Sequence, residues 1–295
     1  ASVIALLVAV WMLVQLPPVQ NWLIDKVTAR LSRDLKTHIS IDRVDFSLFN
    51  KMHLEGVLVK DRGQDTLLSA GAITVNVTDW FFFKQDIELK YIGLRDTYVH
   101  LKRTDSIWNY QFILDYFSTP ASTEKKKDNA INLALREIDL KNIFVRQQDG
   151  WIGQDMTVSL ASLNTVSRKV DFANKNIEIS SLQINQPYFA IFDYDGNRPP
   201  NFKSAVSKPA VADTASNSNN TWKILVSEVA LNNGTFKTDN DSRPLDSSGF
   251  DGKHIEFAKI YGNFKNVRWV GDTITASMTL RTRERSGFEV KRLVA

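Results

Sequence analysis

The stretch Ile138–Val145 reads IDLKNIFV: two apolar residues flank a polar one, a polar break follows, and a second apolar stretch begins. The same plan recurs in Met52–Val59 (MHLEGVLV), Ile92–Val99 (IGLRDTYV), Leu182–Phe189 (LQINQPYF) and Val229–Phe236 (VALNNGTF). Alternation with a period of two is typical of a β-strand that has one apolar and one polar face. Each segment therefore predicts a strand that is interrupted near its middle.

These segments form a quasi-regular repeat. They start at residues 52, 92, 138, 182 and 229, so successive starts differ by 40, 46, 44 and 47 residues. Such a period indicates stacked units in an elongated molecule. Between them lie turn signals such as Asp149-Gly150 and Asn233-Gly234, together with further alternating runs. We therefore expect a mainly β fold, an antiparallel meander, over residues 38–295.

The N-terminus has a different character. Val3–Val14 is an apolar run without charge, which predicts a transmembrane signal-anchor helix over residues 1–16 with Trp11 at the membrane interface. Because crossing the hydrocarbon takes ~20 residues, we expect this helix to be incomplete at its N-terminal side. A secretory signal peptide is the alternative, but no small-residue cleavage pattern ends the run and a second apolar helix follows directly.

That second helix is predicted over residues 17–37. Its apolar residues recur at helical spacing, from Val19 and Trp22 to Leu31 and Leu35, and basic residues occupy the remaining face. Two roles are open for this amphipathic helix. It either covers the end of the first β-layer or lies on the bilayer surface, where Trp22 suits the headgroup interface.

Two segments without periodicity, residues 119–129 and 196–221, are predicted to be flexible, solvated loops or disordered stretches inside the β domain. The first contains Glu124 and three consecutive lysines, and the second is rich in Pro, Ser, Asn and Ala.

The composition and the absence of known motifs argue against a catalytic, metal-binding or nucleic-acid-binding site. Lys and Arg exceed Asp and Glu by only 37 to 33, which is no footprint of nucleic-acid binding, and there is no cysteine. The four histidines are scattered, and no Gly-x-Ser-x-Gly elbow, dinucleotide loop or Walker lysine loop occurs. The acidic clusters near Asp61 and Asp246 fit turns better than a Ca²⁺ loop. We expect no catalytic residues, no metal site and no cofactor, and hence no enzyme.

The apolar face of such a meander needs a partner. One-sided strands bury that face on a second sheet, on themselves or on a ligand, and the sequence predicts only one convincing helix as cover after the anchor. From the residues alone, a closed sandwich with a dry core and an open trough that holds acyl chains both remain.

The order of features resembles the N-terminal region of the AsmA-like family, and within it the TamB branch in the form found in Bacteroidota. The resemblance lies in the anchor, Pro17–Gln20, the amphipathic helix, Ile39–Val44, Met52–Asp61, Asp65–Val75 and the aromatic run Trp80–Phe83. It covers most of the chain and depends on patterning and order.

This resemblance implies a single-pass protein of the bacterial inner membrane whose bulk lies in the periplasm. Its fold would be an elongated, taco-like β-groove that continues beyond this chain and transports phospholipid between the inner and outer membranes, as part of outer-membrane biogenesis. A BamA-like outer-membrane barrel would be a partner through a C-terminal part that this chain lacks. The implied groove lining, placed by alternation, is Ile73, Val75, Val77, Ile87, Leu89, Ile92, Leu94, Ile138, Leu140, Ile177, Ile179, Leu182, Ile184, Val229 and Leu231. Breaks at Lys90-Tyr91 and Ser180-Ser181 leave the face of the neighbouring residues open.

Two other functions stay open. Exposed sheet edges could pair with strands of outer-membrane β-barrel proteins and assist their insertion. A closed structural or adhesive β domain is the third alternative.

Overall fold

A computed structural model describes residues 17–46, 51–78, 88–118, 135–171, 174–199 and 221–295. The chain is mainly β. Two helices are present in this part, α2 (Pro17–Leu35) and α3 (Gln111–Ser118). The strands are β1 (Ile39–Ser40), β2 (Arg43–Phe46), β3 (Lys51–Lys60), β4 (Thr66–Thr78), β5 (Glu88–Arg103), β6 (Glu137–Asp149), β7 (Gln154–Asp171), β8 (Asn176–Asn185), β9 (Tyr188–Asp193), β10 (Lys223–Asn240), β11 (Ile255–Val270), β12 (Thr273–Glu284) and β13 (Glu289–Val294).

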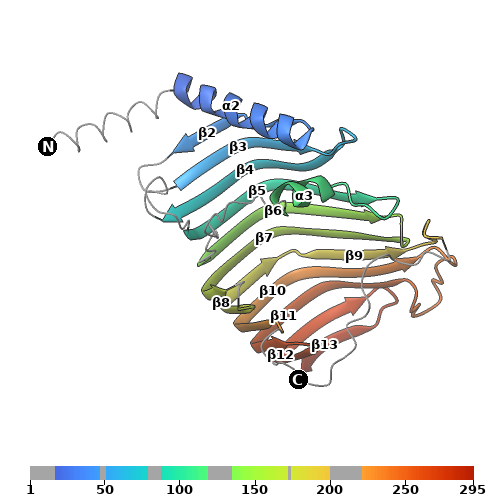
Figure 1. Ribbon diagram of the computed structural model, residues 1–295. Coiled ribbons are helices and arrows are strands. Elements are labelled where there is room, and N and C mark those ends of the chain that lie inside the picture. The colour runs from blue at the N-terminus through green and yellow to red at the C-terminus, as the bar shows by residue number, and fades with distance from the viewer. Residues whose placement is uncertain (1–16, 47–50, 79–87, 119–134, 172–173, 200–220) are drawn as a thin grey trace, which may run out of the picture.

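All of these strands belong to one sheet of 13 strands. Its main path runs β1-β3-β4-β5-β6-β7-β8-β10-β11-β12-β13, so the order in the sheet follows the order in the chain. Strand β2 continues the β1 edge, and β9 continues β8 between β7 and β10. Figure 1 shows the consequence: the sheet grows in one direction, from α2 at one end to the C-terminus at the other.

The predicted antiparallel meander is wrong at three strand pairs. Strands β5 and β6 are parallel, and β10 is parallel to both β8 and β9. A parallel neighbour requires a connection of a dozen or more residues that returns the chain to the starting edge. The two long aperiodic segments lie in these two connections; residues 119–129 lie wholly outside the described residues, and so do residues 200–220 of the second segment.

The sequence repeat has a conformational counterpart. The fifth residue of every unit has a positive φ: Gly56 (62°), Asp96 (50°), Asn142 (53°), Gln186 (49°) and Asn233 (53°). This left-handed conformation suits Gly, Asn and Asp and disturbs the alternation of a strand. The predicted break in the repeat is therefore a line of backbone kinks across the sheet.

At three of these kinks the alternation skips one residue. The left-handed residue and the residue before it are both exposed, as in Arg95-Asp96, Lys141-Asn142 and Asn232-Asn233. Half-buried or buried positions then resume one residue later than strict alternation would place them, at Ile143 and Val145 for example. The half-buried side chains before and after the kink therefore point to the same face of the sheet.

Helix α2 ends in a tight cap and packs on the first strands. Lys36 takes a left-handed φ of 55°, and Thr37 donates its backbone N–H to Ser32 O at 3.0 Å. The Thr37 hydroxyl then contacts Lys60 O at 2.7 Å, which ties the helix end to β3. Leu35 joins Ile39, Leu67 and Phe112 of α3 in a buried cluster.

Neither helix of the described part is long and apolar enough to cross a membrane. The predicted anchor over residues 1–16, with Trp11, lies outside the described residues.

Candidate functional site

Strand register brings apolar residues of distant segments into two adjacent rows. Residues that pair directly across neighbouring strands point to the same face, as do residues two apart along a strand. We call the two rows together the apolar face. The first row is Leu54, Ile73, Leu94, Leu140, Leu163, Ile184, Leu231, Gly262, Leu280 and Leu293. The second row is Met52, Val75, Ile92, Ile138, Thr165, Leu182, Val229, Phe264 and Met278.

Ten of the residues placed in the groove lining by sequence lie in these rows: Ile73, Val75, Ile92, Leu94, Ile138, Leu140, Leu182, Ile184, Val229 and Leu231. Leu89, Ile177 and Ile179 extend the same face towards one set of strand ends. Ile87 and the side chain of Val77 lie outside the described residues.

The two uncertain breaks leave these residues on one face. Val75 pairs with Ile92 and Val77 pairs with Leu89, so β5 carries one extra residue at Lys90-Tyr91. In β8, Leu182 pairs with Thr165 and Ile179 with Ser167, so the extra residue falls at Ser180-Ser181. A β-bulge of this kind absorbs the additional residue and lets the alternation restart on the same side.

Sequence reasoning missed several members of the rows. Leu163 lies in a stretch of β7 that is mixed polar and apolar, and only its pairing with Leu140 and Ile184 reveals its face. Gly262 leaves room for a neighbour, since a Cβ there would meet the Phe264 ring at 2.6 Å. The alternation from Ile274 to Leu280 was a usable signal for Met278 and Leu280.

The apolar face is half-buried. All thirteen residues of the predicted groove lining whose side chains are described are neither fully buried nor exposed. Towards the strand ends that hold Ile177, Trp269 pairs with Ile224 and with Ile274. The side chains of Trp269 and Ile274 are solvent-exposed there, at 46% and 66%. Because the described strands form one sheet, no second sheet among them covers this face.

The other face of the same strands is polar. Asp139, one residue from Ile138 and Leu140, accepts a hydrogen bond from Asn164 Nδ2 at 2.8 Å. Further along, Asn185 Nδ2 donates to Ser162 Oγ at 2.8 Å and Asn232 Nδ2 donates to Asn185 Oδ1 at 3.0 Å. These ladders of paired side chains match a surface in water.

A buried ion pair joins the C-terminal ends of the parallel strands β5 and β6. Arg103 donates from Nε and Nη2 to the two carboxylate oxygens of Asp149, both at 2.7 Å. Burial raises the pKa of Asp149, but the hydrogen bonds from Arg103 and the backbone N–H of Ile152 outweigh it and leave the pKa below its usual value.

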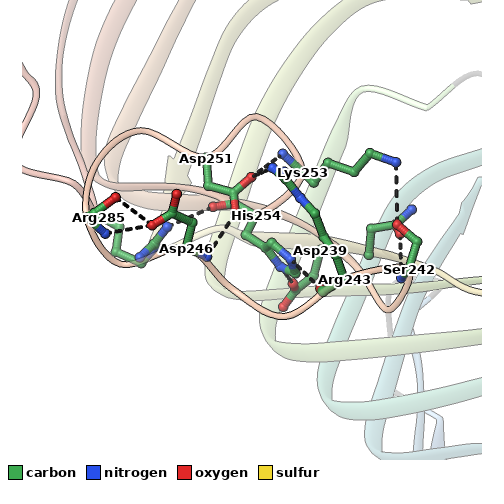
Figure 2. Close-up of polar contacts among 10 residues, drawn as sticks. Asp239, Ser242, Arg243, Asp246, Asp251, Lys253, His254 and Arg285 are labelled. Carbon is green, nitrogen blue, oxygen red and sulfur yellow. Dashed lines mark hydrogen bonds and ion pairs between the residues drawn. The ribbon is translucent and has the colours of Figure 1, made fainter.

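A second polar cluster lies in the connection between β10 and β11 (Figure 2). Asp251 is buried and accepts hydrogen bonds from the backbone N–H groups of Lys253 at 3.0 Å and Asp246 at 3.1 Å, and it pairs with Arg243. These contacts lower its pKa to about 2. His254 contacts the Asp239 carboxylate through Nδ1 and the Arg243 carbonyl oxygen through Nε2 at 3.0 Å.

This cluster borders a hollow of about 350 Å³. Its charged lining mixes basic and acidic groups, and each carboxylate in Figure 2 has a partner within the cluster or its loop. The contacts hold the loop in place. Among the described residues no group of three His, Asp or Glu side chains is arranged to hold a metal ion.

Comparison with known proteins adds no assignment. No protein-family model matches the sequence, and no curated protein matches it.

Proposed function

We propose that the apolar face is a groove that binds the acyl chains of phospholipids and guides them along the molecule. The observation that supports this most is the continuity of the first apolar row over ten strands from β3 to β13. Nine strand spacings of about 4.8 Å make this row roughly 43 Å long, which exceeds the ~30 Å hydrocarbon core of a bilayer.

Half-burial supports a ligand rather than a dry core. A side chain in a closed sandwich loses nearly all of its contact with water, whereas these side chains keep part of theirs. Each methylene group that a lipid buries there gains about 0.8 kcal/mol. Headgroups stay in water in this arrangement, so movement along the rows exchanges one apolar contact for an equivalent one.

In the proposed setting, the chain is a single-pass protein of the bacterial inner membrane with its sheet in the periplasm. The apolar run Val3–Val14 supplies the anchor, and phospholipid is carried towards the outer membrane. The proposal needs no reacting group, cofactor or metal. A BamA-like barrel protein of the outer membrane is the proposed partner.

Photo-crosslinking tests the binding surface. A photoreactive residue in place of Leu140, on the apolar face, should form adducts with phospholipid that mass spectrometry detects. The same residue in place of Asn164, on the polar face of the adjacent strand, is the control and should form few. Equal lipid labelling at both positions would contradict the proposal.

Transport is tested by placing charge in the path. Val75→Asp combined with Ile179→Asp puts two carboxylates on the apolar face, and we expect outer-membrane integrity to fail while the protein level is maintained. Gln183→Asp combined with Asn263→Asp adds the same charge at exposed positions of the polar face and should have no effect. An intact outer membrane in the first variant would exclude lipid passage along these rows.

A further inference from the structure

Helix α2 has two faces, and only one of them is used by the fold. Gln20, Ile24 and Leu35 are buried, and Leu31 packs against the cluster that joins α2 to α3. These positions are separated by four, seven and four residues, so they form one stripe along the helix. This inward stripe accounts for the helix as a cover for the first strands.

A different stripe faces away from the protein. Trp22, Lys26 and Arg30 follow each other at intervals of four residues, and Arg33 lies seven residues after Lys26, two turns further along. Trp22 is 59% exposed, and the side chains of Arg30 and Arg33 are 75% and 77% exposed. From Trp22 to Arg33 the stripe is about 16 Å long. We call these four residues the outer stripe.

Charge on the outer stripe is positive after its ion pairs are counted. Asp34 lies 3.6 Å from Arg30 Nε and 3.6 Å from Arg33 Nε, so one carboxylate serves two guanidinium groups. Asp25 lies beside the stripe. A large exposed aromatic ring next to a group of basic side chains with a net positive charge is a combination that a headgroup layer accommodates, because the ring enters the interface while the long cations reach phosphate.

We propose that the outer stripe docks α2 on a bilayer surface that contains anionic phospholipid. Each basic residue near such a surface strengthens binding by roughly five-fold, and Asp34 offsets one of the three, so the stripe contributes about 25-fold. The inference concerns a surface other than the apolar face, and it places the first strands of the sheet next to the headgroups. It holds or fails independently of what the apolar face binds.

The absence of cysteine allows a local test. Ala29→Cys puts a single thiol on the exposed side of α2, and Ser277→Cys puts one on β12 at the other end of the sheet. Each full-length variant carries an environment-sensitive fluorophore and is reconstituted in vesicles of phosphatidylcholine, with or without phosphatidylglycerol. Because the N-terminal run would tether the chain in both kinds of vesicle, the probe reports the contact of α2 itself.

We expect a blue shift of the Ala29 probe only when phosphatidylglycerol is present, and no shift of the Ser277 probe. Lys26→Glu, Arg30→Glu and Arg33→Glu together should abolish the shift, and Trp22→Ala should reduce it. The matched triple Lys265→Glu, Arg268→Glu and Lys291→Glu changes the net charge equally at exposed sites and should leave it unchanged.

Three results would overturn the proposal. They are an equal shift in phosphatidylcholine alone, a shift that survives the triple change on α2, and no shift in either kind of vesicle. The last result would favour an acidic protein, rather than a membrane, as the partner of the outer stripe. Photo-crosslinking at Leu140 reads the apolar face separately, so failure of either proposal is recognised without the other.

Discussion

The residue at the fifth position of each repeat decides how its strand bends. Gly56 shows this most sharply, since its φ is +62° and a Cβ there would meet Asp42 Oδ2 at 1.9 Å. The other four units use Asp, Asn or Gln at the same position with similar positive φ values. Polar side chains tolerate the left-handed region, and being exposed they also stay in water.

Asn142 offers a direct test of this conformation. Asn142→Gly should leave stability nearly unchanged, because glycine adopts the observed φ of 53° without strain and loses only an exposed hydrogen bond to Asp96. Asn142→Val should lower the free energy of unfolding by about 1–2 kcal/mol, because a β-branched residue is strained there. Urea unfolding followed by circular dichroism measures both. Equal effects of the two changes would contradict a left-handed requirement.

The low pKa of Asp251 predicts that acid destabilises the loop formed by residues 242–252. Its pKa of about 2 in the folded protein lies below the ~3.9 of an unfolded Asp, so its contribution to stability is complete above the unfolded value. That contribution is lost as the pH falls through about 2. We expect the amide protection of residues 242–252, corrected for intrinsic exchange rates, to fall over this acid range.

Two variants sharpen this expectation. Asp251→Asn should lower the protection of the same loop at neutral pH and remove its acid dependence, because the amide cannot carry the charge that Arg243 and the backbone N–H groups stabilise. Asp272→Asn, in the β11–β12 turn, is the control. An acid profile that persists in Asp251→Asn would assign it to another group.

At the scale of elements, α2 and α3 join one end of the sheet through a small shared core. Phe112 of α3 is 5% exposed and packs with Leu35 and Leu67, whereas Leu114 on the same helix is 49% exposed. Replacing each of these residues by alanine therefore compares the loss of a buried side chain with the loss of an exposed one on the same helix.

We expect Phe112→Ala to destabilise the helical end by about 3–5 kcal/mol, because it leaves a cavity among buried side chains. Leu114→Ala should change stability by less than about 0.5 kcal/mol. Hydrogen exchange of α3 and of β3–β5 measures the difference. Similar losses in both variants would argue against a shared core at this position.

At the scale of the whole molecule, each strand contacts its neighbours and little else, as in repeat proteins. The loss of protection in Phe112→Ala should therefore stop before β10–β13, because no second sheet in the described part links distant strands. Uniform loss of protection across the sheet in hydrogen exchange would instead indicate a globally cooperative core.

The two ends of this sheet differ. The β1–β2 side meets α2, whereas β13 has an unpaired side in the part of the chain that is described. The β1–β2 end is therefore covered by helix α2 in the described part of the chain.

Local chemistry determined much of this protein. Period-two alternation predicts the strands, helical spacing predicts α2, and polar or glycine residues at a fixed repeat position predict the interruptions. Because neighbouring units carry the same pattern, most residues of the apolar face were also accessible from the sequence, Leu140 and Leu182 among them.

Only the tertiary structure decided how these pieces combine. Parallel pairing of β5 with β6, the membership of Leu163 in the first row and the meeting of His254 with Asp239 all depend on register between segments that local pattern does not specify. The physical reason is that alternation reports which side of a strand is apolar. Which strand lies next to it depends on the long connections and on bulges that shift register by one residue.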